Sequence, residues 1–75
     1  MGFKLFGMIY QRETKDIVKL MENTNREYEF VDLGDGSTKN MEMLVAITGT
    51  SVLPQLFDGG ESYLGEKQIR AYFGN

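Results

Sequence analysis

Apolar and polar stretches alternate along the first half of the chain, with spacings that predict a strand, a helix and a second strand. Residues 3–10 are dense in apolar and aromatic side chains, which is typical of a strand buried between two layers. Polar residues 11–14 interrupt this run, and residues 15–23 then place apolar side chains at helical spacing. The apolar face of that expected helix consists of Ile17, Leu20 and Met21. Residues 26–33 alternate before becoming apolar, which predicts the second strand.

The second half of the chain predicts a helix, a hairpin and a final helix. Residues 41–48 carry a helical stripe of Met41, Leu44, Val45 and Thr48. The residues available to cap this helix are Ser37, Thr38 and Asn40. Residues 53–57 and 61–64 predict two short strands joined by an Asp-Gly-Gly turn. Gly65 then opens a helix over residues 66–73, in which Ile69, Tyr72 and Phe73 are expected to face inward.

The resulting order, β-α-β-α-β-β-α, defines an α/β fold. A strand–helix–strand start implies a parallel, right-handed crossover, whereas the Asp-Gly-Gly turn implies an antiparallel hairpin at the end. Together they predict a four-stranded mixed sheet with helices on both faces. The 75 residues suit one small domain, so we expect residues 1–75 to form a single domain.

The composition excludes several kinds of chemistry. The sequence has no cysteine and no histidine, which removes disulfides, thiol nucleophiles and the usual ligands of metal centres. Eight basic and 11 acidic residues give a formal net charge of −3, without the basic stripe that nucleic-acid binders need. No apolar run is long enough to span a bilayer, and residues 1–10 lack a signal-peptide cleavage site. We therefore expect a cytoplasmic protein that binds no metal, membrane or nucleic acid.

Pro54 is the only proline, and it stands in the most informative part of the sequence. Proline cannot donate a hydrogen bond to a sheet, so it must occupy a strand start, an edge or a bulge. The pattern Thr50-x-x-x-Pro-Gln-Leu-Phe-x-Gly-Gly precedes the expected hairpin and last helix. With the opening Phe-Lys-Leu-Phe-Gly and the ending Arg-Ala-Tyr-Phe, the chain resembles the glutaredoxins over essentially its whole length. The short phage-type members are the most similar, and the resemblance implies a thioredoxin-like fold.

The resemblance implies a ligand groove beside Pro54. In glutaredoxins this proline is cis, and the residue before it pairs its backbone with an extended thiol peptide, a form of strand addition. Leu53 would have that role here. The groove would lie between residues 10–14, Leu53–Pro54 and Gly65–Glu66. The plainer alternative is that Pro54 only shapes the start of the strand.

The chain departs from the family at the redox motif. Glutaredoxins carry Cys-x-x-Cys where the first helix begins, and the helical phase aligns these cysteines with Gln11 and Thr14. Neither side chain forms a disulfide, so dithiol–disulfide exchange is excluded, and an electron carrier would require that native cysteines had been replaced. Gln11 and Thr14 would instead contact a ligand, or, more simply, Thr14 caps the helix and Gln11 is solvated.

The residues that bind glutathione in the family are also altered. The family pattern Gly-Gly-x-Asp aligns with residues 64–67, where Leu64 replaces a glycine and Lys67 replaces the acid. Lys67 would repel the ammonium group that the acid attracts. The basic residue that often precedes the first cysteine aligns near Met8, which is uncharged. We therefore expect no cofactor, with glutathione kept as the alternative ligand.

Three functions fit this sequence. We favour a non-catalytic module that binds a protein or peptide partner in the Pro54 groove. The second is a residual glutathione-binding or transferase-like enzyme, in which Tyr10 or Thr14 donates a hydrogen bond that lowers the pKa of a bound thiol. The simpler alternative is that Tyr10 is an aromatic residue at the end of a strand, with its hydroxyl in water. The third is a structural remnant or a subunit of a larger assembly, and the oligomeric state stays open.

Overall fold

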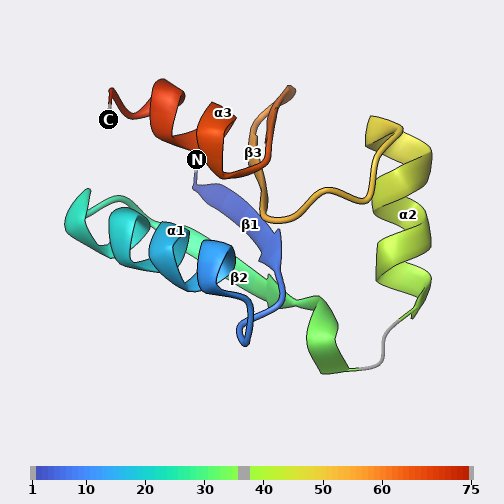
Figure 1. The fold of residues 1–75 in the computed structure, drawn as a ribbon. Helices are drawn as coiled ribbons and strands as arrows, with labels where there is room; N and C mark the ends of the chain where they lie inside the picture. The colour runs from blue at the N-terminus through green and yellow to red at the C-terminus, as the bar shows by residue number, and fades with distance from the viewer. Residues whose placement is uncertain (1, 36–37, 75) are drawn as a thin grey trace.

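The computed structural model describes residues 2–35 and 38–74 and has the expected order of strands and helices (Figure 1). The strands are β1 (Phe3–Gly7), β2 (Tyr28–Asp32), β3 (Gln55–Asp58) and β4 (Glu61–Leu64). The helices are α1 (Arg12–Asn23), α2 (Thr38–Thr48) and α3 (Glu66–Tyr72), with a short 3₁₀ helix η1 (Leu33–Asp35). The predicted β-α-β-α-β-β-α arrangement is confirmed.

The four strands form one mixed sheet in the order β2-β1-β3-β4. β1 pairs parallel with β2 through the crossover helix α1, and antiparallel with β3. β3 and β4 form an antiparallel hairpin in which Asp58 faces Glu61. Gly59, in the turn of that hairpin, has φ of +62°, a conformation that favours glycine. The predicted parallel crossover and terminal hairpin are both confirmed.

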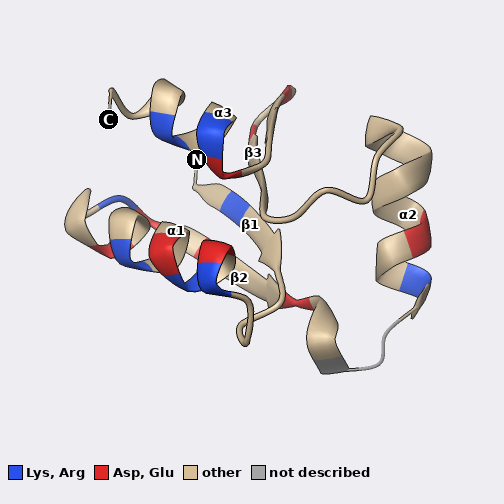
Figure 2. Ribbon diagram, in the orientation of Figure 1, with Lys and Arg blue, Asp and Glu red and all other residues tan. Residues whose placement is uncertain are grey.

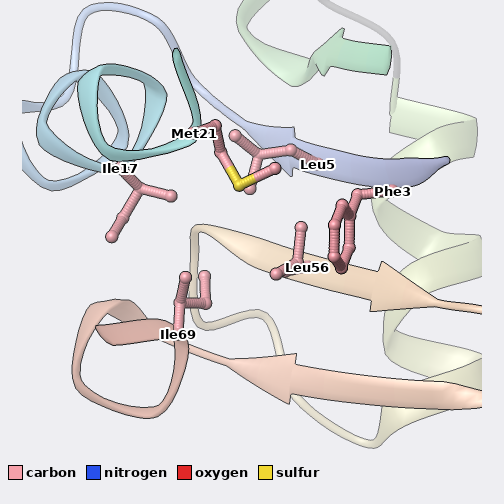
Figure 3. Close-up of a cluster of buried hydrophobic side chains, with 6 residues drawn as sticks. All are labelled: Phe3, Leu5, Ile17, Met21, Leu56 and Ile69. Atoms are coloured by element: carbon pink, nitrogen blue, oxygen red, sulfur yellow. The ribbon is translucent and has the colours of Figure 1, made fainter. Parts of the chain in front are cut away.

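One face of the sheet packs against α1 and α3 and holds the larger cluster of buried apolar side chains (Figure 3). Alternate residues of the strands point into it, because successive strand side chains face opposite sides. The predicted apolar face of α1 supplies Ile17 and Met21, both completely buried, and α3 supplies Ile69. The six buried members are Phe3, Leu5, Ile17, Met21, Leu56 and Ile69.

The other face packs against η1 and α2 and holds a smaller cluster of Phe6, Leu33 and Leu44. The Phe6 ring meets the Phe57 ring edge-on at a centroid distance of 5.5 Å. Leu44 is the buried residue of α2. The Val45 side chain, on the same predicted helical stripe, is 39% exposed, so the stripe is only partly buried. Helices therefore cover both faces of the sheet, as predicted, but α2 buries much less of its own surface.

Several boundaries differ from those predicted. The first strand ends at Gly7 rather than at residue 10, and α1 begins at Arg12, within the polar stretch that was expected to precede it. The loop between them turns back because the Met8 carbonyl accepts a hydrogen bond from the Gln11 N–H at 2.8 Å. β2 is shorter than the expected 26–33.

In the second half, β3 begins at Gln55 because Pro54 has no N–H to donate to the ladder. α2 extends back from the expected residue 41 to Thr38, so Thr38 and Asn40 lie inside the helix, while the candidate cap Ser37 lies outside the described residues. Tyr72 is 37% exposed rather than inward-facing, and α3 ends there. Within residues 2–35 and 38–74, no helix has the length and apolar character needed to cross a membrane.

Candidate functional site

The sheet register brings three separate segments together at one end of the sheet. Phe6 pairs with Gln55, and Gln55 pairs with Leu64, so the next residues in line are Gly7, Pro54 and Gly65. The Gly65 N–H donates a hydrogen bond to the Pro54 carbonyl at 2.8 Å. We call this region, defined by Gly7, Pro54 and Gly65, the Pro54 end of the sheet. It includes the points where α1 and α3 follow their strands (Figure 1).

Leu53 and Pro54 occupy the middle of this region. The Leu53–Pro54 peptide bond is cis, as the family resemblance implied. Pro54 is almost fully buried, while Leu53 is half-buried and packs against the cluster beneath α2. Among the described residues, neither the N–H nor the C=O of Leu53 forms a hydrogen bond within the chain. Leu53 therefore has a backbone donor and acceptor to offer at the Pro54 end of the sheet.

A buried glutamine fixes the segment that leads to Leu53. The Gln55 side chain is completely shielded from solvent, and its Nε2 donates to the carbonyls of Thr50 at 3.1 Å and Val52 at 3.0 Å. The Val52 N–H in turn donates to the Thr50 hydroxyl at 3.2 Å. The Gln55 Oε1 is buried without a partner among the described residues. Sequence reasoning missed this role of Gln55. The only indication in the sequence was that Gln55 directly follows Pro54.

Thr14 lies inside the protein rather than in a ligand groove. Its side chain is completely buried; its hydroxyl accepts a hydrogen bond from the Met8 N–H and donates one to the Gln11 Oε1, both at 3.3 Å. Gln11 has the backbone of the N-cap residue, with no side-chain capping bond, so the expectation that Thr14 caps the helix is wrong. A Cβ added to Gly7 would approach the Thr14 Cγ2 to 2.6 Å. Thr14 therefore joins α1 closely to the end of β1.

Tyr10 is 65% exposed, but its hydroxyl turns back and donates to the Met8 Sδ at 3.0 Å. Its ring lies over Gly34 of η1, where an added Cβ would come within 2.7 Å of it. The Asp32 carboxylate accepts hydrogen bonds from the N–H groups of Ile9 at 3.4 Å and Gly34 at 2.9 Å. Sequence reasoning missed Asp32 as the residue that holds this loop. Its signal was Asp-x-Gly, in which an aspartate bonds to the N–H two residues on.

The remaining predicted residues lie where β4 leads into α3. Gly65 has φ of +93°, and a Cβ there would lie 3.2 Å from the Val52 side chain, so the loop before Pro54 packs closely on Gly65. The Glu66 carboxylate pairs with the Arg70 guanidinium at 3.0 Å, and Lys67 is exposed. The structure thus brings Leu53, Pro54 and Gly65 together, while Thr14 is buried and the Tyr10 hydroxyl bonds to Met8.

The other surface features lie away from the Pro54 end of the sheet. A shallow depression of about 330 Å³ is lined by residues 2–4 and 27–29, and one of about 310 Å³ lies between α1 and α3. Neither includes a predicted site residue. Hydrogen bonding to Asp58 raises the pKa of Tyr72, and desolvation raises the pKa values of Tyr28 and Tyr63. Within the described part of the chain, no cluster of three acidic residues could hold a metal ion.

Comparison with known proteins defines the fold. No family model matches the chain, and no curated protein gives a significant match. Among solved structures, a glutaredoxin from Archaeoglobus fulgidus matches with a TM-score of 0.79 at 16% identity, over 97% of this chain and 86% of that one.

Two plant proteins match equally well. The buckwheat glutaredoxin–glutathione complex gives a TM-score of 0.80 at 21% identity, over 96% of this chain and 69% of that one. Reduced glutaredoxin C1 from Populus tremula x tremuloides gives 0.84 at 20% identity, over 95% of this chain and 62% of that one. The chain therefore has the glutaredoxin type of thioredoxin fold, in a sequence without cysteine.

Proposed function

We propose that this chain is a non-catalytic binding module that pairs an extended peptide with the backbone of Leu53. The observation that carries the proposal is the free N–H and C=O of Leu53 at the Pro54 end of the sheet. One residue with both groups free can exchange two hydrogen bonds with an antiparallel peptide, as in other cases of strand addition. The Gln55 bonds to Thr50 and Val52 support this role, because they fix the segment before any ligand arrives.

The neighbours of Pro54 in the sheet register are two glycines, Gly7 and Gly65. The Thr14 and Val52 side chains pack closely on them, so the backbone around Pro54 is held in place. Catalysis of dithiol exchange needs a thiolate, which this sequence lacks. In the proposed function, this fold binds a partner without catalysing dithiol exchange.

Glutathione is the rival ligand, since one of the structural matches is a complex with it. Three observations argue against it here. The Gly65 N–H is already bonded to Pro54, the Thr14 hydroxyl is buried, and Lys67 has the wrong sign for the ligand's ammonium group. Titration calorimetry decides the matter: we expect no heat of binding at millimolar glutathione, and a saturable signal would favour the transferase-like alternative.

The proposal is tested with peptides selected from a random heptapeptide library displayed on phage. We expect the selected peptides to shift the amide resonances of Leu53 and Gly65 in ¹⁵N-labelled protein. N-methylation of the peptide residue that faces Leu53 removes one backbone donor and should weaken binding by about tenfold, the effect of losing one hydrogen bond of about 1.4 kcal/mol. Methylation of the next residue, which faces away, is the matched control.

Two results would contradict the proposal. One is a library that yields no binder after repeated selection. The other is a set of binders whose resonance shifts lie at the depression lined by residues 2–4 and 27–29 and leave Leu53 unchanged.

A further inference from the structure

Charged residues are absent from two long segments that meet at the Pro54 end of the sheet. Residues 5–11 and 43–57 contain no Asp, Glu, Lys or Arg, although the whole chain has 19 such residues, 8 basic and 11 acidic. Figure 2 shows this distribution: α1 carries basic (blue) and acidic (red) residues, whereas the C-terminal half of α2 and the segment leading into β3 carry neither and are tan. The surface beside Leu53 therefore offers little electrostatic attraction to a charged ligand.

Exposed apolar side chains gather in the same two segments. In the described part of the chain, seven large apolar residues are exposed, and six of them lie within residues 5–11 or 43–57. The six are Ile9, Tyr10, Met43, Val45, Ile47 and Val52. Single exposed apolar residues are ordinary on a protein surface, but their concentration in charge-free segments is typical of an interaction surface.

Three of these side chains lie on the segments that meet at the Pro54 end of the sheet. Val52 precedes it directly, is 51% exposed and packs on Gly65. Ile9 and Tyr10, exposed by 41% and 65%, follow Gly7, which lies beside Pro54 in the sheet register. We call Ile9, Tyr10 and Val52 the apolar rim.

The charges closest to the apolar rim are already paired or project into solvent. The Asp32 carboxylate accepts hydrogen bonds from the Ile9 and Gly34 N–H groups, the Glu66 carboxylate is held by Arg70 at 3.0 Å, and Lys67 is exposed. A charged side chain of a ligand would lose water at the apolar rim and would meet only carboxylates that are already bonded within the protein. An apolar side chain at the same place would remove exposed apolar surface from water.

We infer that the partner is an extended peptide segment with uncharged, bulky apolar side chains, which rest on the apolar rim while its backbone pairs with Leu53. This inference rests on the proposed function and specifies the class of peptide. Backbone pairing gives attachment without selectivity, and the apolar rim supplies the selectivity, because in strand addition the alternate side chains determine specificity.

Three blocked pentapeptides test the inference: acetyl-Ser-Val-Leu-Val-Ser-amide and its two counterparts with Glu or Lys at the centre. Titration into ¹⁵N-labelled protein is expected to give a dissociation constant about tenfold lower for the Leu peptide, consistent with burial of one aliphatic side chain. The resonances of Ile9, Val52 and Leu53 should shift. Val52→Lys should weaken binding of the Leu peptide by about tenfold and reduce its preference over the Glu peptide.

Ile47→Lys is the matched control, because Ile47 is 64% exposed on α2 and lies outside the apolar rim. Unchanged binding is expected for it, and a loss equal to that of Val52→Lys would overturn the inference. Equal or tighter binding of a charged peptide, with shifts at Leu53, would overturn the apolar preference and leave the proposed function standing. If no peptide, including those selected by phage display, shifts Leu53, the proposed function fails too.

A second copy of the chain is the remaining occupant to distinguish. Sedimentation of the protein alone over a range of concentrations measures self-association. A dimer that shifts the Val52 and Ile9 resonances and competes with the Leu peptide would overturn the inference, whereas a monomer supports it.

Discussion

The two faces of the sheet differ in how completely they are covered. Beneath α1 and α3, five apolar side chains are fully shielded from water, and the outward faces of these helices carry charges of both signs. On the opposite face, α2 buries Leu44 and leaves Met43, Val45 and Ile47 exposed. Because apolar burial is the main source of stability, the first face holds the fold together. The second face, which buries fewer apolar side chains, contributes the uncharged surface that continues to Pro54.

Truncation of a core residue tests this comparison with the largest expected effect. Ile17→Ala should lower the free energy of unfolding by about 2–5 kcal/mol, since it removes buried methyl groups and leaves a cavity. Ile47→Ala, the same kind of truncation at an exposed site on α2, should change it by less than about 0.5 kcal/mol. Urea denaturation followed by circular dichroism measures both. Similar losses would show that α2 contributes as much to stability as α1 does.

The contact between Gly7 and Thr14 tests how tightly the α1 face is packed. The methyl group of Gly7→Ala would lie only 2.6 Å from the Thr14 Cγ2 and 2.7 Å from its Oγ1. Because this contact is too close, we expect the free energy of unfolding to fall by roughly 1–3 kcal/mol. Adding Thr14→Ala removes both atoms, and the double variant should be more stable than the sum of the two single losses predicts. Denaturant midpoints give all four values. Strict additivity would mean that the two residues do not touch.

Replacement of Gln55 tests the polar support of the segment before Pro54. Gln55→Met removes the hydrogen bonds to Thr50 and Val52, and we expect a cost of about 1 kcal/mol with faster hydrogen exchange of the Val52 amide. Gln68→Met is the matched control, because Gln68 bonds to Leu64 on the side of α3. Equal Val52 exchange in the two variants would show that Gln55 does not hold this segment.

The smallest expected effect concerns alkaline pH. Hydrogen bonding to Asp58 raises the pKa of Tyr72 above its ordinary value of 10.0, so the folded state holds this proton more tightly than the unfolded state does. The resulting stabilisation is complete below pH 10 and is lost as pH rises through the raised pKa. Tyr72→Phe should therefore flatten part of the fall in unfolding free energy above about pH 10, as measured by urea denaturation. A fall as steep as in the parent protein would contradict this assignment.

The fold could be predicted where the sequence pattern has a single interpretation. Ile17 and Met21 recur at helical spacing among charged residues, so only one face of α1 can be buried, and it is. The same reasoning predicted the helix α2 but does not account for the exposure of Val45. α2 carries apolar residues on several sides, so its spacing does not define which face turns inward. The orientation of α2 depends on the packing of Leu44 against Phe6 of β1 and Leu33 of η1.

The candidate site was predictable in its backbone and not in its side chains. The order of elements, with the family resemblance, was enough to place Pro54 and Gly65 together. Gln55 and Asp32 act on backbone groups of loops, and which groups lie within reach depends on the path of each loop. Thr14 was expected to contact a ligand or to cap α1, but the lack of a side chain at Gly7 gave it space inside.

The pairing of β3 beside β1, at the centre of the sheet, has a consequence for biosynthesis. The cluster beneath α1 combines Phe3 and Leu5 with Leu56 and Ile69, so it draws on both halves of the polypeptide. While the chain is being synthesised, the apolar side of α1 has only Phe3 and Leu5 of this cluster to pack against until Leu56 and Ile69 follow. Full burial of α1 therefore requires the same short hairpin and helix that border Pro54.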